Sequence, residues 1–303
     1  MHNVEWSLVI FTFLVQLSVG FYAALAVINL VTNRKFCCEA VDLLWEHSIS
    51  FATILALIAA VISFFHLGSP LKAFYSILNI ADSWISREIA FLLLFILASM
   101  FLTLLYYRKI NPIHLKCIMG WGIVLIGVLL LIAMSKIYML PTIPSWNSLT
   151  TPLTVFSTTF ILGMLITFSF QYYQLLILSK NKLVKRDETF TRKFLKFVVM
   201  TGLLVMTIEI AINIWQAVNY VNVMTAVTGD EFTTANGMIW YLRLKIIFTF
   251  TGILILVHAY NKGIKRKMKS VDKWIYVGIL LLFMSEFLGR AFFYSTYFQN
   301  GLS

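Results

Sequence analysis

The sequence predicts an all-α polytopic membrane protein, a bundle of eight transmembrane helices with both termini on the periplasmic side. Of its 303 residues, 60% are apolar and only 12% are charged, whereas soluble proteins are about 45–50% apolar and about 25% charged. The apolar residues form windows of roughly 20, each long enough to cross about 30 Å of hydrocarbon. These windows lack the alternation of barrel strands, which leaves helices as the spanning elements.

Eight apolar windows follow one another along the whole sequence. They cover residues 7–31, 46–66, 88–107, 117–138, 153–178, 196–220, 238–260 and 274–298. No stretch remains for a soluble domain, so residues 1–303 are expected to form a single integral-membrane domain. The first window has no cation before it and Arg34 and Lys35 after it. This order is the reverse of a signal peptide, so we expect Met1 to begin the mature protein.

The distribution of positive charge predicts the orientation of the helices. Of the 24 Lys and Arg residues, 18 lie in one alternating set of connections, near residues 34–35, 108–116, 180–196 and 262–273. The opposite connections carry only Lys72 and Arg87, and the other four cations lie inside predicted helices. Basic loops stay in the cytoplasm. The net charge of +11 is therefore attributed to membrane topology, and no nucleic-acid partner is expected.

The cysteines and histidines indicate neither a metal site nor a haem in this protein. The three cysteines, Cys37, Cys38 and Cys117, lie at predicted cytoplasmic ends without CxxC spacing, so free thiols are expected. A haem between two helices needs paired histidines at one depth. The five histidines are His2, His47, His66, His114 and His258. Only His47 and His258 share a level, and both lie at helix ends.

Ionisable residues inside a membrane are costly and are functional candidates by default. Most of them here fall in the predicted outer half. They are His66 and Glu88 on either side of the first external connection, Lys136, Glu209 with Asn213 and Gln216 at i+4 and i+7, Arg243, and the i,i+4 pair Glu286 and Arg290. The clustering predicts an outward-open pocket that handles a ligand and protons.

Each of these residues also has a purely structural interpretation. His66 at a helix end is often an interfacial residue, and Glu286 with Arg290 can be a self-neutralising pair. Lys136 and Arg243 can extend to the outer interface, and Trp146 can be an interfacial anchor. The external connections at 67–87, 139–152 and 221–237 can form a docking platform for other subunits.

Three segments resemble one known family, the anchor subunits of anaerobic dimethyl sulfoxide reductases. They are His66-Leu67-Gly68-Ser69-Pro70-Leu71-Lys72-Ala73-Phe74 with Ser86-Arg87-Glu88-Ile89-Ala90, then Pro144-Ser145-Trp146-Asn147-Ser148 with Thr151-Pro152, and Ser285-Glu286-Phe287-Leu288-Gly289-Arg290 followed by Phe293-Tyr294. Arg243 falls where the family carries an arginine early in its seventh helix. The sequence departs from familiar members in its basic loops and in a longer cytoplasmic connection at 179–195.

The resemblance implies a haem-free subunit of the bacterial inner membrane that oxidises menaquinol in anaerobic respiration. Its implied partners are an iron–sulfur subunit with [4Fe–4S] clusters and a molybdopterin catalytic subunit that reduces an S-oxide or N-oxide. Quinol oxidation removes two protons and two electrons, so His66 is the expected base, while Glu88 orients it or relays its proton. The expected quinol-binding residues are His66, Gly68, Ser69, Arg87, Glu88, Trp146, Arg243, Glu286 and Arg290.

Other functions stay open at this point. The same fold would serve an anchor for polysulfide, tetrathionate or nitrite reductases, and the neighbouring subunit would distinguish these. A proton-coupled permease would transport without partners and open to both faces, which the one-sided polar cluster disfavours. A purely structural anchor would bind no quinol analogue.

Overall fold

Eight long helices make up most of the described residues, and the described ranges contain no strand. The computed structural model describes residues 5–31, 39–65, 79–110, 113–143, 145–180, 188–228, 235–265 and 272–296. The helices are α1 (Trp6–Val31), α2 (Glu39–Ser63), α4 (Trp84–Tyr107), α5 (Ile113–Tyr138), α6 (Thr150–Lys180), α7 (Glu188–Thr228), α8 (Ala235–Lys265) and α9 (Asp272–Ser295). Each holds a stretch long and apolar enough to cross a membrane. The predicted number and order of spans are confirmed, and the periplasmic position of the termini stays a prediction.

Several helices run beyond their apolar windows, and one predicted connection is wrong as a result. The expected connection at 179–195 is helical up to Lys180 and again from Glu188. Residues 188–195 contain neither glycine nor proline, so nothing in them prevents a helix from extending beyond the hydrocarbon. Helix α7 has 41 residues. At about 1.5 Å per residue it is about 60 Å long, roughly twice the apolar thickness of a bilayer.

Both ends of α4 are fixed by local hydrogen bonds. Ser83 caps its start, where the hydroxyl accepts a bond from the amide of Ser86. At its end Lys109 has a positive φ of 54°, and the amides of Lys109 and Ile110 bond back to the carbonyls of Tyr106 and Leu105. This is the Schellman arrangement, with lysine where glycine is usual. The caps fix where α4 begins and therefore the depth of the residues in its first turns.

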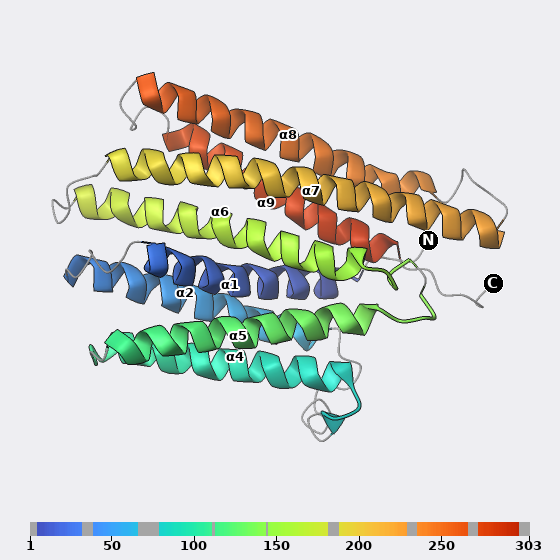
Figure 1. Cartoon of the computed structure of the whole chain (residues 1–303), viewed down its shortest axis with the longest axis horizontal. Helices are drawn as coiled ribbons and strands as arrows, with labels where there is room; N and C mark the ends of the chain where they lie inside the picture. The colour runs from blue at the N-terminus through green and yellow to red at the C-terminus, as the bar shows by residue number, and fades with distance from the viewer. Residues whose placement is uncertain are drawn as a thin grey trace. The chain divides into compact units, whose positions relative to one another are not determined.

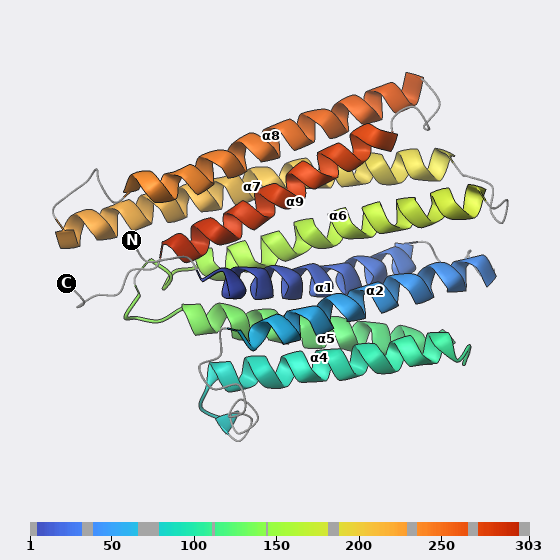
Figure 2. The same ribbon diagram turned by 180° about the vertical axis from the view of Figure 1, so that it is seen from behind.

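Contacts divide the protein into two compact units. The C-terminal unit consists of Met1–Val9, Tyr138–Ile161 and Asp187–Ser303, and the N-terminal unit of Ile10–Ile137 and Leu162–Arg186. Within the first, α8 packs extensively against α9 and α7; within the second, α2 packs against α4. Figures 1 and 2 show α7, α8 and α9 side by side, and α1, α2, α4 and α5 likewise. The expectation of one domain over residues 1–303 stays a prediction.

Glycines allow helices to approach closely in each unit. In the C-terminal unit, a Cβ added to Gly252 of α8 would meet Leu282, and one added to Gly278 of α9 would meet Leu256. In the N-terminal unit, a Cβ on Gly163 of α6 would collide with the backbone of Gly20 in α1. Small residues at helix crossings are a usual source of packing energy in membranes, where lipid is as apolar as the core.

Gly163→Ala is expected to lower the free energy of unfolding by about 1–3 kcal/mol, because the added methyl meets backbone that cannot rotate aside. The matched control is Gly122→Ala in α5, where nothing lies within 4 Å of an added Cβ. That change is expected to be neutral or to stabilise by up to about 1 kcal/mol through helix propensity. Unfolding of the purified protein in detergent, followed by circular dichroism, measures both. Equal stability of the two variants would contradict the close approach.

Candidate functional site

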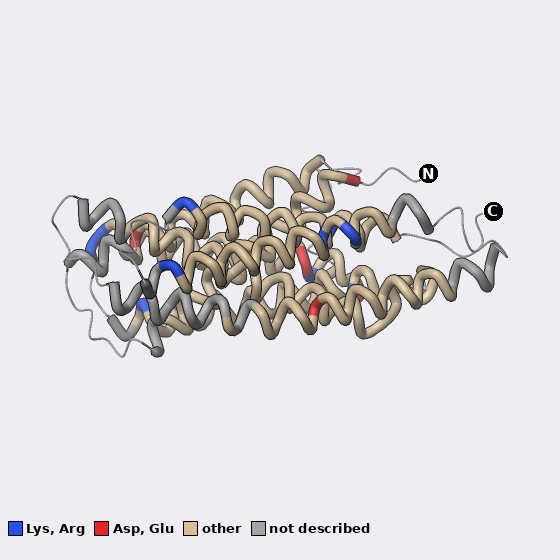
Figure 3. The backbone as a smooth tube through the Cα atoms, turned by 90° about the horizontal axis from the view of Figure 1, so that it is seen from above, with Lys and Arg blue, Asp and Glu red and all other residues tan. Residues whose placement is uncertain are grey.

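Charged residues are sparse along the described helices (Figure 3), yet four charged side chains are buried inside the C-terminal unit. Glu209, Lys245, Glu286 and Arg290 are 1%, 2%, 1% and 3% exposed. The ammonium of Lys245 donates to Oε1 of Glu209 at 2.9 Å and lies 3.8 Å from Oε2 of Glu286. The hydroxyl of Thr158 also donates to Oε1 of Glu209, at 3.0 Å. Glu209, Lys245 and Glu286, one each from α7, α8 and α9, are called the buried triad below.

The two carboxyl groups of the triad are unequally satisfied. Oε1 of Glu209 accepts two hydrogen bonds, and only its Oε2 has none. Both oxygens of Glu286 are buried without a hydrogen-bond partner. Leaving a buried polar group without a partner costs about 1–3 kcal/mol, and more when the group is charged. The triad therefore contains one well-held carboxylate and one with free hydrogen-bonding capacity.

The motif at 285–290 surrounds Lys245. The hydroxyl of Ser285 donates to the carbonyl of Lys245 at 3.1 Å and lies 2.5 Å from the hydroxyl of Thr249. Gly289 leaves space for the ammonium, since a Cβ there would lie 2.6 Å from Nζ. This segment of α9 thus fixes the backbone of Lys245 with one residue and makes room for its charge with another.

Glu286 and Arg290, which the sequence allows as a self-neutralising pair, each contact another group in the structure. Glu286 has its ion contact with Lys245, while the Nη2 group of Arg290 donates to the carbonyl of Thr154 at 3.1 Å. Arg243, one of the expected quinol-binding residues, is exposed. Its side chain and that of Lys245 point about 200° apart on α8, so Lys245 takes the interior position. Sequence reasoning counted this lysine among the intrahelical cations but did not name it as a site residue.

The remaining predicted polar residues divide between the interior and the surface. Asn213 and Gln216 are buried on the same face as Glu209, and the Asn213 amide donates to the Glu209 carbonyl at 2.7 Å. Lys136 and His258 are not buried, and the His258 ring meets Trp274 edge-on at 5.9 Å. The surface positions of Lys136 and Arg243 agree with the interpretation that these cations extend to the interface.

Trp146 is 6% exposed and is therefore not an interfacial anchor of the usual kind. Its indole N–H donates to the carbonyl of Phe293 at 3.0 Å and to the hydroxyl of Thr296 at 3.2 Å. Its ring stacks on Phe293 at 5.2 Å and meets Tyr138 edge-on at 5.4 Å. The guanidinium of Arg290 lies 5.8 Å from the same Phe293 ring. Trp146 thus joins the α5–α6 connection to the end of α9, next to the buried charges.

Arg87 and Glu88 lie in the first turns of α4, in the N-terminal unit. Arg87 donates to the carbonyls of Ile80 and Ala81, and its guanidinium lies 4.2 Å from the ring centre of Trp84. It therefore holds the preceding turn against the helix start. Oε1 of Glu88 is buried and has no hydrogen-bond partner. Glu88 is the residue of this pair with free hydrogen-bonding capacity.

Three of the predicted site residues, His66, Gly68 and Ser69, lie outside the described residues, and so do Cys37 and Cys38. Cys117 is a free thiol, as expected. Among the described side chains, no group of three or more His, Cys, Asp or Glu is placed to hold a metal ion.

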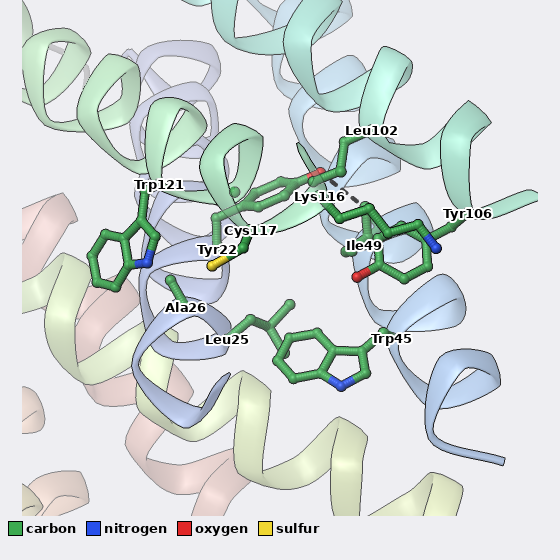
Figure 4. Close-up of a pocket in the computed structure, with 11 residues that line it drawn as sticks. Tyr22, Leu25, Ala26, Trp45, Ile49, Leu102, Tyr106, Lys116, Cys117 and Trp121 are labelled. Carbon is green, nitrogen blue, oxygen red and sulfur yellow. Dashed lines mark hydrogen bonds between the residues drawn. The ribbon is translucent and has the colours of Figure 1, made fainter. Parts of the chain in front are cut away.

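A separate pocket in the N-terminal unit involves none of the predicted site residues. Its lining includes Trp45, Tyr106, Lys116, Cys117 and Trp121 (Figure 4). The ammonium of Lys116 lies 4.0 Å from the ring centre of Tyr106, an arrangement that stabilises a cation in an apolar setting. The cavity of about 40 Å³ has room for about three water molecules.

Comparison with known proteins gives one consistent result. The sequence model of one family, described as DMSO reductase anchor subunit (DmsC), matches residues 1–296. The C subunit of an anaerobic dimethyl sulfoxide reductase from Haemophilus influenzae is 26% identical over 302 residues, which cover 99% of the present sequence and 97% of the relative. The subunit of the same name from Escherichia coli is 31% identical over 166 residues, covering 54% of the present sequence and 56% of the relative.

Proposed function

The protein belongs to the family of DMSO reductase anchor subunits, and from this premise we propose that it binds menaquinol and oxidises it. The family makes it the membrane anchor of a dimethyl sulfoxide reductase, a part of an oxidoreductase complex. Eight helices that can cross a membrane agree with such an anchor. We also propose that the protein lies in the bacterial inner membrane and that both of its termini lie in the periplasm.

The buried Oε1 of Glu88 without a hydrogen-bond partner is the observation that carries the quinol role. Such an oxygen near a helix start can accept a hydrogen bond from a ligand hydroxyl, or a proton. His66 is the proposed first base, because an imidazole changes charge near neutral pH. Glu88 then orients the imidazole or takes the proton onward. Arg87, which already binds two backbone carbonyls, positions this helix start.

The other proposed quinol-binding residues have separate supports. Gly68 and Ser69 are proposed from the resemblance alone. Arg290 is proposed to stabilise the negative charge that develops on the quinol, and Glu286 to take part in the transfer of its protons. The buried Trp146 is proposed to position them, since it packs on Phe293 beside Arg290. For Arg243 the only argument is that the family carries an arginine at this point of the helix, because the side chain of Arg243 itself is exposed.

The two electrons of the quinol are proposed to leave this subunit, because the proposed reductase uses them elsewhere in the complex. We propose that an iron–sulfur subunit and a molybdopterin catalytic subunit receive them at the periplasmic face. Their cofactors supply the reduction of an S-oxide or N-oxide. The connections at 67–87, 139–152 and 221–237 are the proposed docking platform.

His66→Ala and Glu88→Gln are each expected to lower menadiol-driven reduction of dimethyl sulfoxide at least tenfold in membranes that carry the assembled reductase. Each change removes a proton acceptor, and general acid–base groups contribute about 10²-fold or more to such rates. The measurement compares menadiol with a reduced viologen dye, which feeds electrons to the partner subunits without a quinol site.

The matched control is Glu46→Gln, which removes a half-buried carboxylate of α2 outside the proposed site. It is expected to keep the wild-type rate with both donors. Viologen-driven activity should stay normal in all variants. Full menadiol-driven activity in both His66→Ala and Glu88→Gln would overturn the quinol role, and loss with both donors in either variant would show failed assembly instead of lost chemistry.

A further inference from the structure

We propose that the buried triad binds and releases one proton in each quinol turnover, with Glu286 as the carboxyl group that carries it. This inference rests on the proposed function for its source of protons. It assigns roles to Glu209 and Lys245, which the quinol proposal leaves without one, and it gives Glu286 a role in proton transfer.

The first support is the uneven sharing of one ammonium between two carboxyl groups. Lys245 lies 2.9 Å from Glu209 and 3.8 Å from Glu286. The second hydrogen bond to Glu209, from Thr158, strengthens the nearer pair. Glu286 is 1% exposed and accepts no hydrogen bond at either oxygen. Its negative charge is therefore stabilised less than that of Glu209. Of the two carboxyl groups, it is therefore the one that can change its proton occupancy at the smaller loss of hydrogen bonds.

The second observation in favour is that the ammonium of Lys245 can move when the protonation of Glu286 changes. An ammonium on four methylenes can move by about 1 Å without moving its helix, and it has three donors. The missing side chain of Gly289 leaves room for it, since a Cβ there would lie 2.6 Å from Nζ. When Glu286 holds a proton, Lys245 pairs with Glu209 as observed. When Glu286 is ionised, the ammonium can approach it.

The remaining titratable and charged groups near the triad are held by other contacts. Arg290 donates to the carbonyl of Thr154. The hydroxyl of Tyr294 donates to that of Tyr138 at 2.9 Å, and both rings pack against Trp146. None of these described groups donates a hydrogen bond to Glu286. This leaves Glu286 as the exchangeable position within the set.

The proton balance is simple. Oxidation of one quinol breaks two O–H bonds and gives a quinone, two protons and two electrons. The electrons pass to the partner subunits of the proposed complex. One of the two protons forms an O–H bond on Glu286, and the other goes to His66, the proposed first base. Both are later released to water, so the triad returns to its starting charge after each turnover.

Glu286→Gln tests this role, because the amide keeps the size of the side chain and cannot take the proton. We expect menadiol-driven dimethyl sulfoxide reduction to fall about tenfold while viologen-driven reduction stays at the wild-type level. Binding of a hydroxyquinoline N-oxide quinol analogue, measured in the same membranes, shows how much of the fall comes from weaker binding and how much from lost proton transfer. Infrared difference spectra on addition of menadiol should show a carboxyl C=O band in the wild type that shifts in D₂O and is missing in the variant.

Glu5→Gln is the matched control, since Glu5 is an exposed glutamate of the same unit; it should keep both the rate and the band. Glu286→Asp keeps a carboxyl group and should restore the band with part of the rate, which also covers a failure of Glu286→Gln to assemble. A full rate and an unchanged band in Glu286→Gln would overturn the inference. The quinol role itself is tested separately, by the menadiol-driven activity of the wild type, His66→Ala and Glu88→Gln.

Discussion

Lys245→Met is expected to lower the free energy of unfolding by about 3–5 kcal/mol, the usual result of removing one partner from a buried ion pair. Lys245 is the only cation within 4 Å of Glu209 or Glu286 among the described residues. Without it, both carboxyl groups stay buried in a low dielectric, and Thr158 is the one hydrogen-bond donor to their oxygens in the described part of the chain. Methionine fills a similar volume, so a cavity adds little to the loss. Unfolding in detergent micelles, followed by circular dichroism, measures it.

The triple variant Glu209→Gln, Lys245→Met and Glu286→Gln is expected to recover most of this loss. Removing all three charges together leaves no unpaired ion, and buried ionic sets replaced as a whole are often neutral or more stable. Lys136→Met, a change at a lysine of α5 that is not buried, should stay within about 0.5 kcal/mol. If Lys245→Met is no less stable than Lys136→Met, the ion pair does not hold the C-terminal unit together.

Measuring both the stability and the menadiol-driven rate of the triple variant distinguishes a structural role of the triad from a role in proton transfer. The triple variant is expected to be stable and yet slow with menadiol, because it lacks the exchangeable carboxyl group of Glu286. A stable triple variant with full quinol oxidation would mean that the triad serves packing alone. Stability and turnover therefore give independent information on the same three residues.

The fold could be predicted because length and hydropathy alone decide which segments cross a bilayer. Those quantities give the depth of a residue but not the direction of its side chain. Arg243 and Lys245 have nearly the same depth, and only packing of α8 on α9 decides which one is interior. Sequence reasoning accordingly chose Arg243, and the structure places Lys245 inside.

A signal for Lys245 was nevertheless present in the residue types. Lys245, Thr249, Gly252 and Leu256 recur at helical spacing and include the small residues that allow close helix contact. The stripe that follows Arg243 at the same spacing is bulky and exposed, with Ile247, Phe250 and Leu254 at 53%, 55% and 66% exposure. Comparing the two stripes would have assigned the polar small-residue face to the interior.

Trp146 shows a different limit of sequence reasoning. A tryptophan in a proline-rich connection between two spans is typical of the membrane interface. The connection instead folds back so that Ser145 donates to the carbonyl of Thr296 at 2.7 Å, 151 residues away in sequence. No local pattern encodes this contact, because it depends on where α9 ends relative to the α5–α6 connection.

Trp146→Ala is expected to lower the free energy of unfolding by about 3–5 kcal/mol, the range for truncating a buried large aromatic side chain. The change removes the stack on Phe293, the edge contact with Tyr138 and the two hydrogen bonds of the indole. Trp240→Ala, at a tryptophan that is 57% exposed on α8, is the control and should change stability by less than about 1 kcal/mol. Unfolding in detergent micelles compares the two.

Trp146→Phe separates the contribution of the aromatic ring from that of the indole hydrogen bonds. Phenylalanine keeps an aromatic ring beside Phe293 but cannot donate to the carbonyl of Phe293 or to Thr296, so a loss of about 1–3 kcal/mol is expected. Because Arg290 lies 5.8 Å from the Phe293 ring, a shift of that ring moves the guanidinium as well. Weaker binding of the quinol analogue in Trp146→Phe than in Trp240→Phe would therefore show that the contact of Trp146 with Phe293 affects the ligand. Equal binding in both would assign Trp146 to holding the α5–α6 connection on α9 and remove it from the quinol-binding residues.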